Sequence, residues 1–332
     1  MAGVQGSALA IAVSNAGALG SLPCAMLTAE TLQQELTTLT RHTREPYNVN
    51  FFCHTAQAAD PKREANWRNT LRPYYLELGI EPDNIPHGPG RAPFDAAMAD
   101  VLESFRPPVV SFHFGLPEPA LLARVKRWGA KVWSSATTVD EARWLEANGA
   151  DAIIAQGLEA GGHRGMFLTE DLTTQTGTIA LLPQIVQAVR LPVIAAGGIA
   201  DAAGVAAALA LGAQAVQVGT AYLLCPEATT SAVHRAALQS KKARHTALTN
   251  VFTGRPARGM VNRVMAELGH ISPDAPAFPW ATGAIAPLRA KAESQGSGDF
   301  SPLWCGQNAS GCRAGSAAGI TQALMAGANP AA

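Results

Sequence analysis

Short apolar runs alternate with helix-like segments along most of the chain. From residue 108 onward the pattern predicts strands at residues 108–114, 131–135, 151–156, 192–198 and 215–219. The segments between them have helical periodicity and cover residues 118–128, 139–148, 179–189 and 201–211. Strands that are apolar on both faces and separated by helices indicate a parallel sheet. Two earlier runs, at residues 18–22 and 48–52, bring the prediction to seven strands.

The residues that follow these runs favour a (β/α)8 barrel over an open doubly wound sheet. An open sheet would have a Gly-rich fingerprint after its first strand. Here polar residues and glycines follow several strands instead: Asn50, His113, Ser135, Gln156, Gly198 and Gln217. In a barrel, functional residues come from the C-terminal ends of many strands. We therefore predict an α/β TIM barrel whose first strand is missing or reduced to residues 1–4.

Two segments depart from the repeat. Residues 55–107 are polar and contain several prolines, which predicts a helical insertion that covers the barrel as a lid. Residues 246–332 contain the run FTGRPARGM (residues 252–260) and a Gly/Ala/Ser-rich end. We expect this C-terminal segment to complete the barrel and the lid. The barrel itself is then formed by residues 1–54 and 108–245.

Composition narrows the classes of function. The 332 residues contain 25 basic and 25 acidic side chains, so the formal net charge is zero and no nucleic-acid partner is expected. Apolar stretches are broken well before the ~18 residues of a membrane span. The five cysteines form no C-x-x-C pair, and neither a disulfide framework nor a metal site is indicated. We expect a cytoplasmic protein, because no signal peptide is recognisable.

The stretch QGLEAGGHRG, residues 156–165, carries the strongest chemical signal. Glycines after a strand let the backbone approach a ligand closely, and His163 places a titratable imidazole beside them. The alternative is that His163 only fastens the loop. His113, between two phenylalanines, is as consistent with a buried structural histidine as with a substrate contact. We interpret Glu159 as a carboxylate that braces the loop rather than as a general acid or base.

Two later glycine-bearing strand ends are spaced by one βα unit, as expected for a phosphate site in a barrel. They contain Gly198 in the first and Gln217, Val218, Gly219 and Thr220 in the second. The amides of Asn50 and Gln156 suit the edge of a flavin ring, which alternates donors and acceptors. A glutamine at a strand end could equally satisfy a neighbouring backbone group. From spacing, flavin mononucleotide (FMN) is a reasonable hypothesis for the ligand.

The stretches QGLEAGGHRG, AAGGIAD, QVGTAYL, NVNFF and SNAGALGSL resemble the nitronate monooxygenases, formerly called 2-nitropropane dioxygenases. The resemblance covers essentially the whole chain. It implies a barrel that holds FMN non-covalently and no metal, with His163 as the catalytic histidine and His113 as a second active-site histidine. It assigns the FMN contacts to Asn50, Gln156, Gly161, Gly198, Gln217, Val218, Gly219 and Thr220.

The same resemblance implies the reaction and one feature of the start. Family members oxidise alkyl nitronates, notably propionate 3-nitronate, with O2 and without NAD(P)H, which detoxifies nitro compounds. A homodimer is one possible assembly. Residues 1–3 are similar to the turn that ends the family's first strand, so we expect this chain to begin inside that strand unit.

Alternatives remain open from the sequence. One is an FMN-dependent NADH:quinone or enoyl-acyl-carrier-protein reductase of the same barrel lineage, and another is an inactive barrel that binds FMN or a phosphate. The protonation state of His163 is also open. A protonated imidazole would stabilise an anionic nitronate, whereas a neutral one could take the α-proton of a nitroalkane.

Overall fold

Seven parallel strands form one curled sheet in the computed structural model, which describes residues 1–85 and 91–328. Their order along the sheet is β1-β2-β3-β4-β5-β7-β8, so each strand lies beside the next one of the series. The prediction of seven parallel strands is confirmed, and the fold is TIM-barrel-like. The strands are β1 (Gly20–Pro23), β2 (Tyr47–Phe52), β3 (Val109–His113), β4 (Lys131–Ala136), β5 (Ala152–Gln156), β7 (Val193–Ala196) and β8 (Ala215–Gln217).

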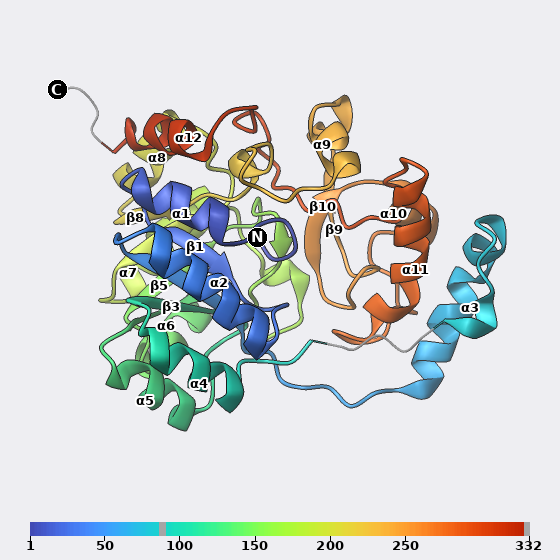
Figure 1. Cartoon of the computed structure of the whole chain (residues 1–332), viewed down its shortest axis with the longest axis horizontal. Coiled ribbons are helices and arrows are strands. Elements are labelled where there is room, and N and C mark those ends of the chain that lie inside the picture. Colours follow the sequence, from blue (N-terminus) through green and yellow to red (C-terminus); the bar gives the residue numbers. More distant parts are fainter. Residues whose placement is uncertain (86–90, 329–332) are drawn as a thin grey trace.

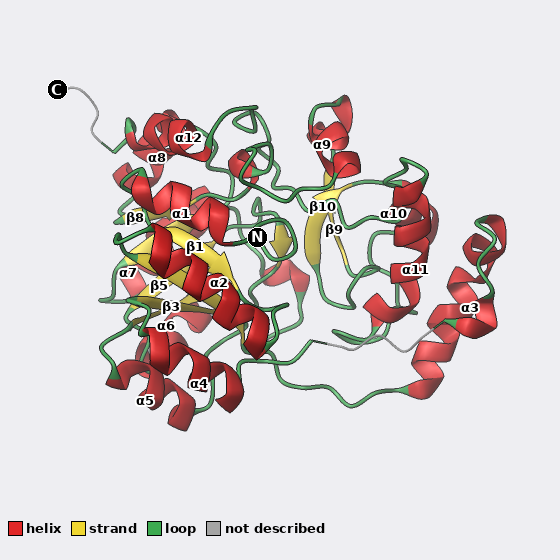
Figure 2. Cartoon of the chain, viewed as in Figure 1, coloured by secondary structure: helices red, strands yellow, loops and turns green. Residues whose placement is uncertain are grey.

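Helices cover the outside of this sheet (Figures 1 and 2). α12 packs against both α8 and α1, so the helical layer is continuous from β8 round to β1. Among the described residues no strand pairs with both edges of the sheet, although the Gln5 amide donates to the carbonyl of Ser21 on β1. The barrel helices are α1 (Ser7–Asn15), α2 (Ala29–His42), α4 (Ala96–Phe105), α5 (Pro119–Arg127), α6 (Val139–Ala147), α7 (Thr178–Ala188), α8 (Ala202–Ala210) and α12 (Ala317–Met325).

Helix α4 lies where the sequence interpretation did not place it. Residues 55–107 were assigned as a whole to the lid, but Ala99 and Leu102 of α4 are buried in the barrel core with residues of β2 and β3. The helix also packs between α2 and α5. The polar composition of the segment locates an insertion but does not show which of its helices returns to the barrel. The inserted part therefore ends before α4.

A second lobe combines the insertion with the C-terminal segment (Figure 1). The Trp67 indole donates to the carbonyl of Ala281 at 3.3 Å, and the Tyr75 hydroxyl donates to the carbonyl of Ala284 at 2.6 Å. Both side chains are buried, and with Leu288 they belong to one apolar cluster. The lobe contains α3 (Pro61–Glu77), α10 (Arg263–Leu268), α11 (Ala281–Ser294) and an antiparallel sheet of β6 (Gly162–His163), β10 (Ala257–Met260) and β9 (Thr246–Thr249).

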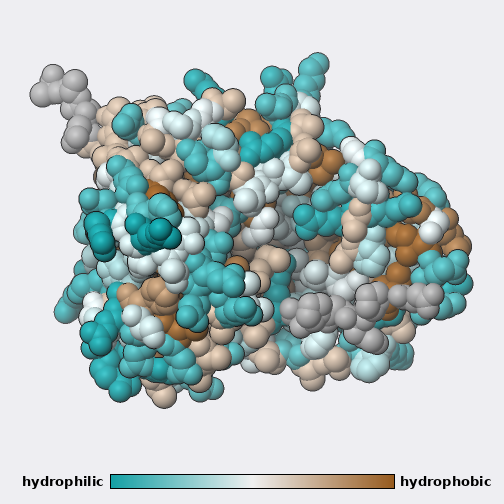
Figure 3. Space-filling model, in the orientation of Figure 1, coloured by the Kyte–Doolittle hydropathy of each residue, from teal (hydrophilic) through white to brown (hydrophobic). Residues whose placement is uncertain are grey.

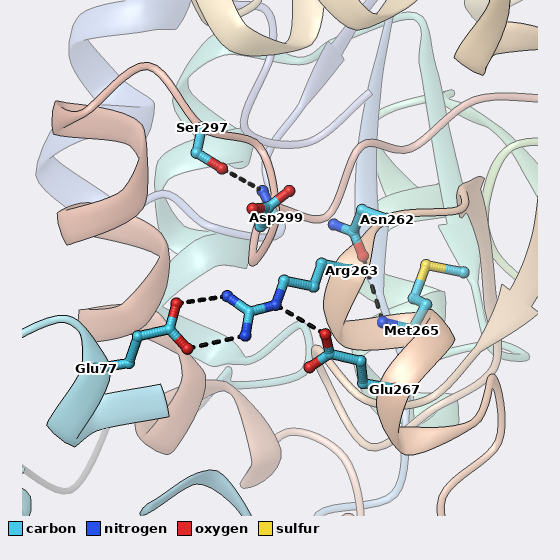
Figure 4. A network of polar contacts seen from close by, with 7 residues as sticks. All are labelled: Glu77, Asn262, Arg263, Met265, Glu267, Ser297 and Asp299. Atoms are coloured by element: carbon cyan, nitrogen blue, oxygen red, sulfur yellow. Dashed lines mark hydrogen bonds and ion pairs between the residues drawn. The ribbon is translucent and has the colours of Figure 1, made fainter. Parts of the chain in front are cut away.

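Arg263 links two helices of this lobe on its surface (Figure 4). Its guanidinium forms a bidentate pair with Glu77 of α3, at 2.6 and 2.8 Å, and its Nε donates to Glu267 at 2.8 Å. Such exposed pairs each contribute at most about 1 kcal/mol. The apolar cluster, rather than this network, therefore accounts for most of the cohesion of the lobe.

The remaining elements are short. They are η1 (Pro82–Asn84), η2 (Leu172–Thr174), η3 (Thr220–Tyr222), α9 (Ala232–Leu238) and η4 (Lys241–Arg244). In the described part of the chain, no helix has the length and apolar character that crossing a bilayer requires. The five cysteines are free thiols, and Cys24, Cys225 and Cys305 are buried.

Candidate active site

A cavity of about 280 Å³ lies at the C-terminal ends of the strands, where the second lobe meets the barrel. The molecular face in Figure 3 is hollowed between the two lobes. Strand register brings the site together, since Phe52 pairs with His113, Gln156 with Ala196, and Ala196 with Gln217. The cavity is lined by all ten residues singled out from the sequence: His163, His113, Asn50, Gln156, Gly161, Gly198, Gln217, Val218, Gly219 and Thr220.

Backbone donors face the cavity beside β7 and β8. The N–H groups of Gly198, Gly219 and Thr220 have no protein acceptor within the described residues. Gly198 has φ +75°, a conformation that side chains other than glycine rarely adopt. Unpaired N–H groups gathered at strand ends suit a phosphate, which accepts several hydrogen bonds at once. This arrangement fits the phosphate of a mononucleotide.

The C-terminal segment supports the two glycine loops. The amide of Asn308 donates to the Gly198 carbonyl at 2.8 Å, and the Gly306 N–H donates to the Thr220 hydroxyl at 3.0 Å. Both Gly306 and Asn308 line the cavity. The hydroxyl of Thr220, a residue that the sequence assigned to the phosphate site, is thus used inside the protein. Nothing in the local sequence around residues 306–308 indicated this contact.

Gln156 and Asn50, the two amides at strand ends, differ in which side-chain atoms remain free to bind a ligand. Gln156 uses both side-chain atoms on its own loop: Nε2 donates to the His163 carbonyl at 2.9 Å, and Oε1 accepts from the Gly165 N–H at 2.7 Å. This is the backbone-satisfying alternative described above. Asn50 donates to the Ser111 hydroxyl at 2.8 Å, while its Oδ1 has no partner among the described residues. Asn50 therefore retains an acceptor for a ligand.

The loop from β5 to β6 is held rigidly. The Glu159 carboxylate accepts from the backbone N–H and the hydroxyl of Thr178, both at 2.8 Å, at the start of α7. Its interpretation as a loop brace is confirmed. The fully buried Arg164 donates to the carbonyls of Gln156 and Gly157 and to the side chain of Gln175. These contacts fix the backbone that carries His163.

Gly161 is needed for close packing against another segment. A Cβ at this position would lie 2.6 Å from the backbone nitrogen of Gly306 and 2.7 Å from the carbonyl carbon of Cys305. Backbone atoms at such distances cannot yield as the end of a flexible side chain can. Glycine here thus lets the loop that carries His163 contact the segment that also supports the glycine loops after β7 and β8.

His163 is buried with one ring nitrogen bonded and the other free. Nε2 lies 2.9 Å from the Thr253 hydroxyl, and Nδ1 has no partner among the described residues. The residue is 9% exposed. Burial, with a smaller effect of the nearby Arg91 charge, holds the pKa of His163 well below its usual value of 6.5. The imidazole is therefore neutral near pH 7, which the sequence left open.

His113 has both ring nitrogens occupied. Nε2 lies 3.1 Å from the His163 carbonyl, and because a carbonyl only accepts, Nε2 must carry the hydrogen. Nδ1 then accepts from the Ser135 hydroxyl at 3.0 Å. Burial lowers the pKa of His113 to about 3. With no free nitrogen, His113 is placed to position the His163 backbone rather than to exchange protons.

Several residues around His163 were not predicted from the sequence to belong to the site. The His163 ring packs against Phe52, Phe278 and Trp304, with ring centroids 5.9, 5.5 and 5.6 Å apart. Thr253 lies inside the FTGRPARGM run, for which the sequence indicated no function. Phe278 and Trp304 come from the C-terminal segment, where no motif pointed to them. They make the space around His163 largely apolar.

The family model for nitronate monooxygenase matches residues 1–327. The chain belongs to the nitronate monooxygenase family. Among relatives, a nitronate monooxygenase of Pseudomonas aeruginosa is 42% identical over 98% of this chain and 93% of its own length. One from Paraburkholderia phytofirmans is also 42% identical, over 98% of this chain and 89% of its own. The suspected resemblance is thereby confirmed.

Solved structures agree with this family assignment. A nitroalkane oxidase from Streptomyces ansochromogenes is 38% identical with a TM-score of 0.89, over 98% of this chain and 93% of that one. FabK from Thermotoga maritima is 26% identical with a TM-score of 0.70, over 98% of this chain and 90% of that one. The first likeness supports the barrel that the sequence predicted for this nitronate monooxygenase family member.

Proposed function

We propose that this protein oxidises alkyl nitronates with O2, using FMN bound non-covalently in the cavity and without NAD(P)H. The observation that carries the proposal is the neutral, buried His163, whose free Nδ1 shares one cavity with the unpaired N–H groups of Gly198, Gly219 and Thr220. Substrates are small nitronates such as propionate 3-nitronate, either bound as the anion or formed in the site from the parent nitroalkane. The enzyme would act in the cytoplasm to remove reactive nitro compounds.

The residues present fit FMN. The backbone of Gly198 and of the Gln217–Thr220 stretch would hold its phosphate, with Val218 and Gly219 on the wall of the cavity. Asn50, Gln156 and Gly161 line the space left for the ring. FMN held there would supply the redox chemistry that links nitronate oxidation to O2. The protein's own contribution is to bind, orient and manage one proton.

His163 manages that proton. With a nitroalkane, the neutral imidazole takes the α-proton on Nδ1, the C–H bond breaks, and its electron pair remains on the substrate as nitronate. The resulting imidazolium and the anion then attract each other through a charge-assisted hydrogen bond. Thr253 holds Nε2 throughout. We propose that His113 acts as a positioning residue, because it bonds the His163 carbonyl and leaves no nitrogen free.

The test is oxygen uptake by FMN-loaded protein on addition of propionate 3-nitronate without NADH. We expect uptake that depends on the nitronate. NADH-dependent reduction of quinones or of enoyl thioesters, with no uptake on nitronate, would assign the protein to the reductase alternative. A flavin spectrum without turnover of any of these substrates would instead support the inactive barrel.

A His163→Ala variant tests the central residue. Loss of a positioned acid–base group is expected to lower nitroalkane turnover by ~10²-fold or more. The FMN absorbance per protein should stay unchanged, since the N–H groups proposed to hold the phosphate lie on other loops. His42→Ala is the matched control, because His42 is exposed on α2, away from the cavity. Near-normal turnover in His163→Ala would remove His163 from the mechanism.

A further inference from the structure

The described part of the cavity wall has one ionised side chain, and burial lowers the pKa of the Met1 amine in the same wall to about 6, so that this amine is mostly neutral at pH 7. Among the described residues that line it, Arg91 is the only one whose side chain is ionised near pH 7, since burial keeps His113 and His163 neutral. No aspartate or glutamate is found in this part of the wall. The cavity therefore presents one cation and no counter-ion to whatever enters it, which favours an anionic ligand group.

Arg91 differs from the other arginines near the site in having no acceptor. Arg164 and Arg258 donate to backbone carbonyls, and Arg255 donates to the carbonyl of Met166. For Arg91, by contrast, the described residues provide neither a carboxylate nor a carbonyl partner for the guanidinium. The side chain is only partly exposed, so water does not fully replace these bonds. An unpaired guanidinium in a half-buried wall suits a ligand that supplies the acceptors.

The guanidinium lies on the substrate side of the site rather than at the glycine loops. Its Cζ is 5.7 Å from the centre of the Phe278 ring, and the His163 ring is 5.5 Å from the same ring centre. The backbone of Arg91 is fixed as well, since its carbonyl accepts from His54 Nε2 at 2.9 Å. Arg91 and His163 thus lie against one phenylalanine, with both facing the cavity.

We propose that Arg91 is a specificity-determining residue that binds the two oxygens of the nitronate or nitro group while His163 faces the α-carbon. The inference rests on the proposed function for the identity of the substrate. A planar guanidinium matches a planar pair of oxygens in a bidentate geometry. Negative charge grows on those oxygens as the α-proton leaves, and the aromatic surroundings strengthen its attraction to Arg91.

Nitrate is the probe that separates this proposal from turnover. It is a planar anion with nitronate-like oxygens and no α-proton, so it can bind but cannot react. In FMN-loaded protein, calorimetric titration should give an affinity for nitrate that Arg91→Met lowers roughly 10- to 100-fold, as expected for lost charge-assisted bonds. Arg91→Lys should retain part of the nitrate affinity, because the positive charge remains while the bidentate geometry of the guanidinium is lost.

Arg289→Met is the matched control. Arg289 is an exposed arginine of α11, close enough for its charge to act on Arg91, and it does not line the cavity. The Arg289→Met substitution should leave the nitrate affinity unchanged. In steady-state assays with nitronate, Arg91→Met should raise KM more than it lowers kcat. Retained FMN absorbance and circular dichroism in Arg91→Lys would show that the site is still assembled.

These titrations distinguish failure of the Arg91 proposal from failure of the proposed function. Unchanged nitrate affinity in Arg91→Met overturns the proposal, whatever the wild-type protein turns over. An equal loss in Arg289→Met overturns it too, because long-range charge would then suffice. A shifted FMN reduction potential with unaltered nitrate binding would assign Arg91 to the flavin instead. If nitrate binding falls as expected but no nitronate is oxidised, the anion site stands and the proposed function fails.

Discussion

His163 has one nitrogen held by Thr253 and the other turned to the cavity, in surroundings that disfavour its charged form. A neutral imidazole can accept a proton, and a second group must then provide the positive charge that an anionic substrate needs. We propose that two side chains divide these tasks, with His163 transferring the proton and Arg91 supplying the positive charge.

The Thr253 hydroxyl is expected to orient the His163 ring. Thr253→Val preserves shape and removes the hydrogen bond, which is worth about 1 kcal/mol, so kcat/KM should fall roughly five- to tenfold. Thr253→Ser should restore most of it, since the hydroxyl returns. The pH profile of kcat/KM provides the second measurement, because a changed bond to Nε2 should move its acidic limb. An equal loss of kcat/KM in Thr253→Val and Thr253→Ser would indicate that Thr253 acts through packing and does not orient the His163 ring.

At the residue scale, the sequence predicted the site residues that stand together in one contiguous motif. It missed those that tertiary contacts bring to the site. His163 and its glycines stand together in ten residues, so their chemistry could be recognised. Thr253 is 90 positions away from His163. The motif also could not show that the Gln156 amide bonds its own loop, because both alternatives need the same residue at the same strand end.

At the scale of elements, the loop that carries His163 and the segment at residues 305–308 form one unit. The Gln307 N–H donates to the Glu159 carbonyl at 2.9 Å, and Gly161 faces the backbone of Cys305 and Gly306. The same segment supports Thr220 and Gly198. A displacement of either partner should therefore reach both the His163 side and the proposed phosphate side of the cavity.

Gly161→Ala tests this coupling. The added methyl would meet backbone nitrogen and carbon below 3 Å, so the loop and the 305–306 segment must separate. We expect a clear loss of bound FMN, measured as flavin absorbance per protein. Gly315→Ala is the control, because nothing lies within 4 Å of a Cβ there and its φ is not positive. Normal FMN content in Gly161→Ala would mean that the two segments move independently.

Strands and helices could be predicted where the hydrophobic pattern is local. The elements against which they pack could not. The predicted strand at residues 131–135 and the observed β4 (Lys131–Ala136) nearly coincide. Helix α4 shows the limit: its apolar residues mark a helix with a buried face, but nothing in them says which core that face joins. Assignment to the barrel required the contacts of α4 with α2 and α5.

At the scale of the whole molecule, buried histidines set the response to acid. The pKa values of His54, His113, His163 and His234 are all lowered by burial, to about 3 for His113 and about 4 for His234. Below pH 6.5 these histidines bind protons in the unfolded chain but stay unprotonated in the folded chain. Folding stability must therefore decrease as pH falls from 6.5 towards these values.

Urea unfolding at about pH 7.5 and about pH 5 measures this effect. The contribution of His113 alone approaches about 1.4 kcal/mol per pH unit below pH 6.5. His113→Asn should reduce the acid-dependent loss of stability, because an amide does not titrate. His42→Asn, an exposed control, should leave the loss as in the wild-type protein. An identical pH dependence in His113→Asn would contradict the assignment.

The second lobe has a consequence for the order of events during synthesis. Trp67 bonds to Ala281, which leaves the ribosome 214 residues later. At 5–20 residues per second, this interval is roughly 10–40 s. Throughout it the buried face of α3 has no core to join, while the barrel strands between are already emerging. Nascent chains should therefore expose Trp67 and Tyr75 to chaperones for most of translation, and the second lobe should form only after the barrel strands have emerged.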